Sequence, residues 1–481
     1  MLFGHPPPVR KICVLTLGAV LLGSAAQAEP TAAHANAAHA DAGAAPDAVG
    51  ARGPGGAPMD PAWFDARVTA IAQYFQQALV PGLPGAVTQV EAALPFTITA
   101  FSRFGGVRLA GGELTGELSA WGRVGPRDAL LGDGDLTAAW AQLERGMLKL
   151  KLGRQVTLPG AARYVRFDGA TLGFTFGLAE LTVYGGWVAL PRWNLPRGAV
   201  LAGFAGDALL DPYLVEQQNR AGQLAAGARL AMRFGGYGRA GLGYHEQYDA
   251  RGLAFRVVGL DAAGQPASWL TIGGRVTFDL VAQAVPEARL FADVTGVRVP
   301  FSIDYSYQSP ALLLPKTSLL AAFGGAAWHE LGAETTVALP VSLKLTGRVA
   351  GQLFDGELPG GRASLRLQWT PGLAGRLFVL AEAGRALVPP AGFTWARAGA
   401  RYRATETLWG SVDAAVYFYD VAVRGYRSSV TGIGSLEWYV LPLVRTVFSA
   451  TVMSTPFAAF EAQGLVRLVV ELTPNSAGGI L

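Results

Sequence analysis

Ser342-Leu343-Lys344-Leu345-Thr346-Gly347-Arg348-Val349-Ala350-Gly351-Gln352-Leu353 is the stretch that decides the fold. Its lysine, threonine, arginine and glutamine share the even positions, and its leucines and its valine share the odd ones. Successive side chains of a β-strand point to opposite faces, so this stretch predicts a strand that is apolar on one face and charged on the other.

The same alternation recurs from about residue 95 to residue 474, in short segments that end at glycine, proline or aspartate. A long series of such segments is typical of a transmembrane β-barrel, which turns its apolar face to lipid and its polar face to a lumen. After the N-terminal region, no stretch reaches the roughly 18 consecutive apolar residues of a membrane-spanning helix. We therefore predict an all-β, closed antiparallel transmembrane β-barrel. A large soluble β-sandwich or propeller is the alternative, which the length of the series and its low outward charge disfavour.

The first residues predict the compartment. Arg10 and Lys11 precede a short apolar run, Ile12–Leu22, and a small-residue cleavage site ending at Ala28. This pattern predicts a secretory signal peptide over residues 1–28 and, with the barrel, a location in the outer membrane of a Gram-negative cell. The only cysteine, Cys13, lies inside the signal. We therefore expect a mature chain without disulfides, thiolate metal sites or cysteine nucleophiles.

Four further regions follow the predicted signal. We expect a disordered linker rich in Ala, Gly, Pro and His over 29–59, and a periplasmic amphipathic helix with its lead-in over 60–94. The barrel then covers 95–474, and a short tail covers 475–481.

The helix is predicted from local signals. Asp60 is a good N-cap, Pro61 suits the first helical position, and apolar residues recur at helical spacing between Phe64 and Leu79. Docking against the floor of the barrel is the expected role of this helix. A plug or a partner-binding helix is the alternative.

The alternating segments can be counted. Twenty-one candidates lie between Phe96 and Thr473, whereas single-chain bacterial barrels have even strand numbers. We expect about 18 strands, within a range of roughly 16 to 20, and place the error in the stretch before Glu113. Tight turns such as Pro340–Val341 alternate with long connections such as Pro191–Gly222, which we expect to be extracellular.

The alternation also assigns an inner face, on which cations outnumber acids and gather in the last third of the barrel. Low-dielectric walls focus the field of such a row, and the arginine fork suits carboxylate and phosphate groups. The predicted anion conduit consists of Lys149, Lys151, Arg154, Arg229, Arg233, Arg275, Lys344, Arg348, Arg362, Arg366, Arg397, Arg401, Arg403 and Arg467. Pairing of these cations with lumen carboxylates, simply to fill the barrel, is the alternative.

A short motif points to a family. Leu150-Lys151-Leu152-Gly153-Arg154-Gln155, followed by Phe167-Asp168-Gly169-Ala170, resembles outer-membrane porins of the alginate-export type. The resemblance covers about residues 147 to 190 by motif and the rest of the barrel by pattern only. It implies a monomeric barrel of about eighteen strands whose arginine-lined lumen conducts an anionic polysaccharide outward. It also implies that Arg154, Gln155 and Asp168 lie at the extracellular rim.

The predicted function is therefore an outer-membrane pore with a cationic lumen, which passes anionic solutes or exports an anionic polysaccharide. Its expected partners are outer-membrane lipid and, if the resemblance holds, a periplasmic polysaccharide-export component. The sequence contains no lysine-arginine block for nucleic acid, and we expect no cofactor and no metal.

Two other classes of function remain as alternatives. A structural or adhesive barrel is one. A barrel-wall enzyme is the other, but His245 and His329 do not neighbour a convincing nucleophile motif, and we expect no enzymatic activity.

Overall fold

The computed structural model describes residues 62–79, 89–93, 96–124, 133–157, 160, 165–189, 223–249, 252–309, 327–354, 359–372, 375–388, 391–423, 425–456 and 458–472. All of them belong to one compact unit, Pro58–Leu481. The predicted signal peptide (1–28), linker (29–59) and tail (475–481) lie outside the described residues, as does the loop predicted over Pro191–Gly222.

Twenty-three antiparallel strands make up the described part of the chain. They are β1 Trp63–Leu79, β2 Gln89–Ala93, β3 Phe96–Leu109, β4 Gly112–Val124, β5 Asp133–Arg145, β6 Leu148–Thr157, β7 Val165–Phe176, β8 Ala179–Val188, β9 Leu224–Arg233, β10 Gly238–Asp249, β11 Gly252–Ala267, β12 Leu270–Asp279, β13 Ala284–Val294, β14 Phe301–Gln308, β15 Trp328–Leu339, β16 Leu343–Phe354, β17 Gly360–Trp369, β18 Leu377–Val388, β19 Ala391–Arg403, β20 Leu408–Val423, β21 Tyr426–Leu441, β22 Val444–Ser454 and β23 Ala458–Leu472.

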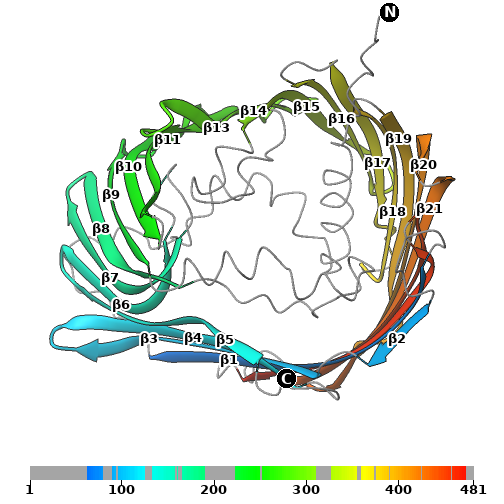
Figure 1. Ribbon diagram of the computed structural model, residues 1–481, viewed down its shortest axis with the longest axis horizontal. Coiled ribbons are helices and arrows are strands. Elements are labelled where there is room, and N and C mark those ends of the chain that lie inside the picture. The colour runs from blue at the N-terminus through cyan, green and yellow to red at the C-terminus, as the bar shows by residue number, and fades with distance from the viewer. Residues whose placement is uncertain are drawn as a thin grey trace, which may run out of the picture. The chain divides into compact units, whose positions relative to one another are not determined.

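These strands close into a ring (Figure 1). From β3 to β23, each strand pairs with the next along the chain, and β1 joins β23 to β3. The short β2 also pairs with β1, beside the half of β1 that β3 does not reach. Because β2 and β3 occupy one place in the ring, the wall contains 22 strands, that is, 23 minus one. The predicted closed antiparallel barrel is confirmed.

The predicted strand number is wrong. The error lies before Glu113, as suspected, but it is an omitted strand and not a falsely marked one. All twenty-one segments marked from the sequence overlap strands, including Phe96–Leu109, which precedes Glu113. The missing strand is β1, which makes the count even. The barrel therefore begins at Trp63 and not at residue 95.

The predicted N-terminal helix is also wrong, because its residues form β1. Apolar side chains fit a helical spacing here, but they also alternate: Phe64, Val68 and Tyr74 are all exposed on one face, while Arg67 and Thr69 lie on the other. Pairing with β23 on one side and β3 on the other satisfies the backbone of β1 and removes two open edges, which outweighs local helical preference. No helix among the described residues is long and apolar enough to cross a membrane.

The two ends of the barrel differ in their connections. One end, the short-turn end, has tight turns such as those at Gly146 and Gly177, whose φ of +59° is a conformation that glycine adopts without strain. The other, the long-loop end, carries the longest connections, between β8 and β9 and between β14 and β15. The ladder brings the start of β1 and the end of β23 together at the short-turn end.

The wall has two chemically different faces. Val349, Leu365, Val412 and Phe418 lie on the outer face and are all more than half exposed. Ionisable side chains occupy the alternate positions and face the lumen, as on β16, where Arg348 neighbours Val349. The alternation that predicted the strands therefore also separates an apolar exterior from an ionic interior.

Candidate functional site

The inner face of β16–β19 forms a stripe of cations. Seven predicted conduit residues lie there, and Glu382 is the only carboxylate among the inward positions of these four strands. We refer to these seven as the cation stripe: Lys344, Arg348, Arg362, Arg366, Arg397, Arg401 and Arg403. The clustering predicted for the last third of the barrel is therefore present on adjacent strands.

Carboxylates on the flanking strands pair with the cation stripe. On one side, Arg348 lies 3.0 Å from Asp304 of β14 and 3.3 Å from Glu330 of β15, and Arg362 also contacts Glu330. Glu330 is almost fully buried, and Gln352 donates a further hydrogen bond of 2.7 Å to it.

On the other side, Arg397 lies 2.9 Å from Asp413 of β20, and Arg401 lies 3.5 Å from Glu437 of β21. Within the stripe itself, the Arg366 Nε lies 3.0 Å from Glu382. Arg403 contacts Glu406 in the turn, whereas Lys344 has no ion pair with any described residue.

Apart from Arg154, the remaining predicted residues are distributed along other parts of the inner face. Their ion pairs are Lys149–Glu144 at 3.5 Å, Arg229–Asp261 at 2.8 Å, Arg233–Glu180 at 3.6 Å and Arg275–Glu287 at 2.7 Å. The Lys151 ammonium lies over the ring of Trp140, 3.9 Å from its centroid, and Arg467 lies opposite Val447 and Ile71. Pairing with carboxylates, which the sequence left open as an alternative, is thus widespread among these cations.

Sequence reasoning missed several of these carboxylates. Glu330 and Asp261 lie just beyond the predicted ends of their strands, and Glu144 lies in a predicted turn. Glu334 and Glu437 lie on predicted strands, at positions that share a face with the conduit residues. Continuing the alternation one or two residues past each predicted end would have found the first three. Applying it within the predicted strands would have found Glu334 and Glu437.

Aromatic side chains adjoin the cation stripe on the same inner face. Trp395 lies opposite Tyr417 in the ladder, and Phe393 lies opposite Tyr419. We call these four residues the platform. Phe393 is 5.8 Å from Trp395 and 6.1 Å from Tyr417 between ring centroids. All four side chains are half-buried, so each keeps part of its ring accessible.

Arg154 differs from the other predicted conduit residues. Its register opposite Ala139 and Asp168 places it on the face of the exposed Leu152, which is the outer face, so its assignment to the lumen is wrong. Gly153 precedes it with a φ of +115°. Gln155, one residue further, points inward and is buried, and donates 3.1 Å to the Gly169 carbonyl.

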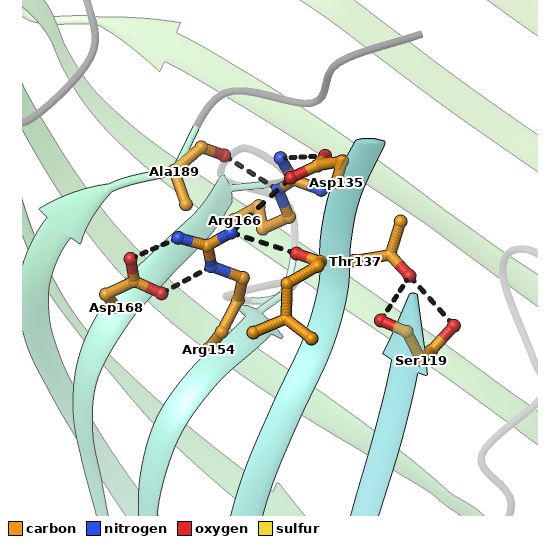
Figure 2. Close-up of polar contacts among 8 residues, drawn as sticks. Ser119, Asp135, Thr137, Arg154, Arg166, Asp168 and Ala189 are labelled. Atoms are coloured by element: carbon orange, nitrogen blue, oxygen red, sulfur yellow. Dashed lines mark hydrogen bonds and ion pairs between the residues drawn. The ribbon is translucent and has the colours of Figure 1, made fainter. Parts of the chain in front are cut away.

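A seam in the wall explains the position of Arg154. The β5–β6 ladder stops at Ala139 and Arg154, although β5 continues to pair with β4 and β6 with β7. Arg154 spans this seam, donating two bonds of 2.6 Å to Asp168 and one of 3.0 Å to the Leu136 carbonyl. Figure 2 shows Asp168 and Asp135 on opposite sides of its guanidinium. A side chain therefore satisfies a strand carbonyl that no amide of β6 reaches.

Arg166 completes the seam from β7. Its Nε donates 2.8 Å to the Ala189 carbonyl, and a terminal nitrogen lies 2.7 Å from Asp135 (Figure 2). Both partners of the Arg166–Asp135 pair are buried. The two arginines thus hold β5, β7 and the end of β8 together at the long-loop end.

Removing Arg166 is expected to destabilise the barrel strongly. Arg166→Met removes the guanidinium that lies 2.7 Å from the buried Asp135, which should lower the free energy of unfolding by about 3–5 kcal/mol. Arg233→Met is the matched control, because the Arg233–Glu180 pair on the inner face is 65% and 30% exposed and should be worth about 1 kcal/mol or less. Urea unfolding in lipid vesicles measures both. Equal effects would contradict a structural role for the seam.

The inner face from β6 to β12 is buried toward the long-loop end, whereas Arg233, near the short-turn end, is 65% exposed. Phe167, His245, Val257 and Asp279 there are among the largest fully buried side chains. His245 Nδ1 lies 2.7 Å from the Tyr184 hydroxyl.

The second histidine of interest, His329, lies on the outer face beside Tyr305, with its Nδ1 2.8 Å from that hydroxyl. The described residues contain no group of histidine, cysteine and carboxylate side chains arranged to hold a metal ion.

Comparison with known proteins gives distant structural matches only. No protein-family model matches the chain, and no curated protein matches it. The P pilus usher PapC translocation pore is 10% identical, covering 85% of this chain and 99% of that one, with a TM-score of 0.42. OccAB3 of Acinetobacter baumannii is 9% identical over 85% and 99%, with a TM-score of 0.44. The outer membrane channel DcaP of the same organism is 8% identical over 85% and 97%, with a TM-score of 0.31.

Proposed function

We propose that this protein is an outer-membrane pore that admits anionic solutes along the cation stripe. The observation that carries the proposal is the closed 22-strand wall with an apolar outer face and an ionic inner face. In lipid, a closed barrel satisfies every strand amide and carbonyl within the wall, and its apolar exterior matches the hydrocarbon. The short-turn end then faces the periplasm, and the long-loop end faces the exterior.

The anion preference is supported by the distribution of charge. Carboxylates of β14, β15, β20 and β21 flank the cation stripe, so positive charge is concentrated over four adjacent strands instead of being spread around the wall. Low-dielectric walls focus such a field into the lumen, and charged rings set the selectivity of pores. Export of an anionic polysaccharide, with a periplasmic partner and a monomeric barrel, is the finer form of this proposal, and the motif at Arg154 and Asp168 supports it only as a resemblance.

Planar-bilayer recording tests the pore directly. The refolded protein should give stepwise currents, and in a potassium chloride gradient the reversal potential should lie on the chloride side of zero. A bilayer without steps would contradict the pore, and a reversal potential on the potassium side would contradict the anion preference.

A further inference from the structure

The inner wall at β17–β20 juxtaposes guanidinium groups with aromatic rings. In the ladder, Arg366, Glu382 and Arg397 form one row across β17, β18 and β19. The next row toward the long-loop end contains Trp395 and Tyr417 of the platform. Two residues along a strand advance roughly 6.8 Å, which is the distance between the two rows. A six-membered ring with one substituent has about this length.

The two arginines retain hydrogen-bonding capacity. Arg397 contacts both oxygens of Asp413 through its Nε, at 3.0 and 2.9 Å, and Arg366 contacts Glu382 through its Nε. The terminal nitrogens of both side chains donate to no described residue. The side chains are 36% and 39% exposed for Arg366 and Arg397, respectively. The terminal guanidinium nitrogens of these arginines can therefore donate hydrogen bonds to a carboxylate in the lumen, in the planar geometry that suits bidentate recognition.

The wall also fixes the orientation of Trp395. A Cβ at Gly384, directly opposite in the ladder, would lie 2.2 and 2.4 Å from two atoms of the indole. The indole therefore lies across the wall over Gly384, in space that a larger side chain would fill, and it stays partly accessible. Tyr417 extends this surface on the neighbouring strand.

We propose that Trp395, Tyr417, Arg366 and Arg397 form a binding site for small cyclic carboxylates. The ring of the ligand stacks on the platform, and its carboxylate accepts hydrogen bonds from the free terminal nitrogens of the two arginines. The site deepens the proposed function and rests on it, because the ligand reaches the site through the pore. A sugar ring and an aromatic ring share the required chemistry, which is an apolar face beside a carboxylate.

Single-channel recording with three probes tests the site. Glucuronate and benzoate carry rings of the two kinds, and gluconate is an open-chain carboxylate of the same charge as glucuronate. We expect at least one ring probe to block the current about tenfold more strongly than gluconate, as stacking typically contributes. The relative strengths of glucuronate and benzoate distinguish a sugar site from an aromatic one.

Variants separate the two parts of the site. Trp395→Ala with Tyr417→Ala should abolish the advantage of the ring probe over gluconate. Arg366→Gln with Arg397→Gln should weaken block by all three probes. Gly384→Val should act like the platform variant by displacing the indole without deleting it. Trp140→Ala is the control, because Trp140 faces the lumen beside Lys151, away from the platform.

The outcomes distinguish this inference from the proposed function. The absence of any current steps would overturn the pore itself. Open channels that glucuronate, benzoate and gluconate block equally would overturn the binding site alone. An effect of Trp140→Ala as large as that of the platform variant would also overturn it.

Discussion

A chain that begins at Gln89 will not form a barrel. Without β1, residues 458–472 of β23 and 97–105 of β3 lose their ladder partners on one side. Each unsatisfied backbone group in lipid costs several kcal/mol, and β1 contributes partners to two strands, so the total exceeds the stability of an ordinary domain. Refolding into detergent and vesicles should give no heat-modifiable band on gel electrophoresis and no protease-resistant core.

The matched control is a chain that begins at Pro58, the first residue of the compact unit, which should refold like the longer protein. A finer variant is Val68→Pro, because Val68 pairs with both Val470 and Ala100 and proline has no amide hydrogen to donate. A protease-resistant barrel from the chain that begins at Gln89 would show that residues 63–79 only dock against the wall, as a helix would.

Reversing three charges of the cation stripe is expected to invert ion selectivity. Arg397→Glu, Arg401→Glu and Arg403→Glu together place three carboxylates near Asp413 and Glu437, which already lie there. The local potential changes sign, and the ratio of anion to cation permeability should fall by about tenfold, equivalent to ~1.4 kcal/mol. Reversal potentials in a potassium chloride gradient give this ratio directly.

A swapped ion pair is the control for this variant. Arg397→Asp with Asp413→Arg preserves the pair and the total charge of the wall, so selectivity should remain close to that of the parent protein. An unchanged reversal potential in the triple variant would mean that these arginines only fill the barrel, the alternative that the sequence also allowed.

Much of the fold follows from the sequence, because a two-residue period is a local property. Every strand from β3 to β23 overlaps a predicted one, and the faces assigned on β16 and β19 agree with the ladder. β1 was not predicted as a strand because several of its apolar residues fit a helical as well as an alternating pattern. Only its long-range pairing with β23 decides between the two. Closure of a ring depends on residues more than 400 positions apart, as Ala66 and Leu472 show.

The site was harder to predict, for reasons of geometry. The seam at β5 and β6 cannot be recognised in the sequence. Arg154 follows the alternation of its strand to the outer face, and there it donates to a carbonyl of β5 beyond the end of the β5–β6 ladder. The ion pairs Arg348–Asp304 and Arg401–Glu437 each join strands two places apart, a proximity that no single strand reveals. The platform depends on Gly384, which reads in sequence as an ordinary strand glycine.

The burial along β6–β12 bears on the size of solute that can pass. The circumference of a barrel grows with its strand number, but only the wetted arc of the wall borders a channel. Here Phe167, His245 and Asp279 are buried on β7, β10 and β12, whereas the platform on β19 and β20 keeps part of each ring accessible. Figure 1 shows β7–β10 and β19–β20 on opposite sides of the ring. At the level of these buried residues, the part of the wall that borders water is therefore smaller than a 22-strand perimeter suggests, whereas near the short-turn end of the same arc Arg233 is 65% exposed.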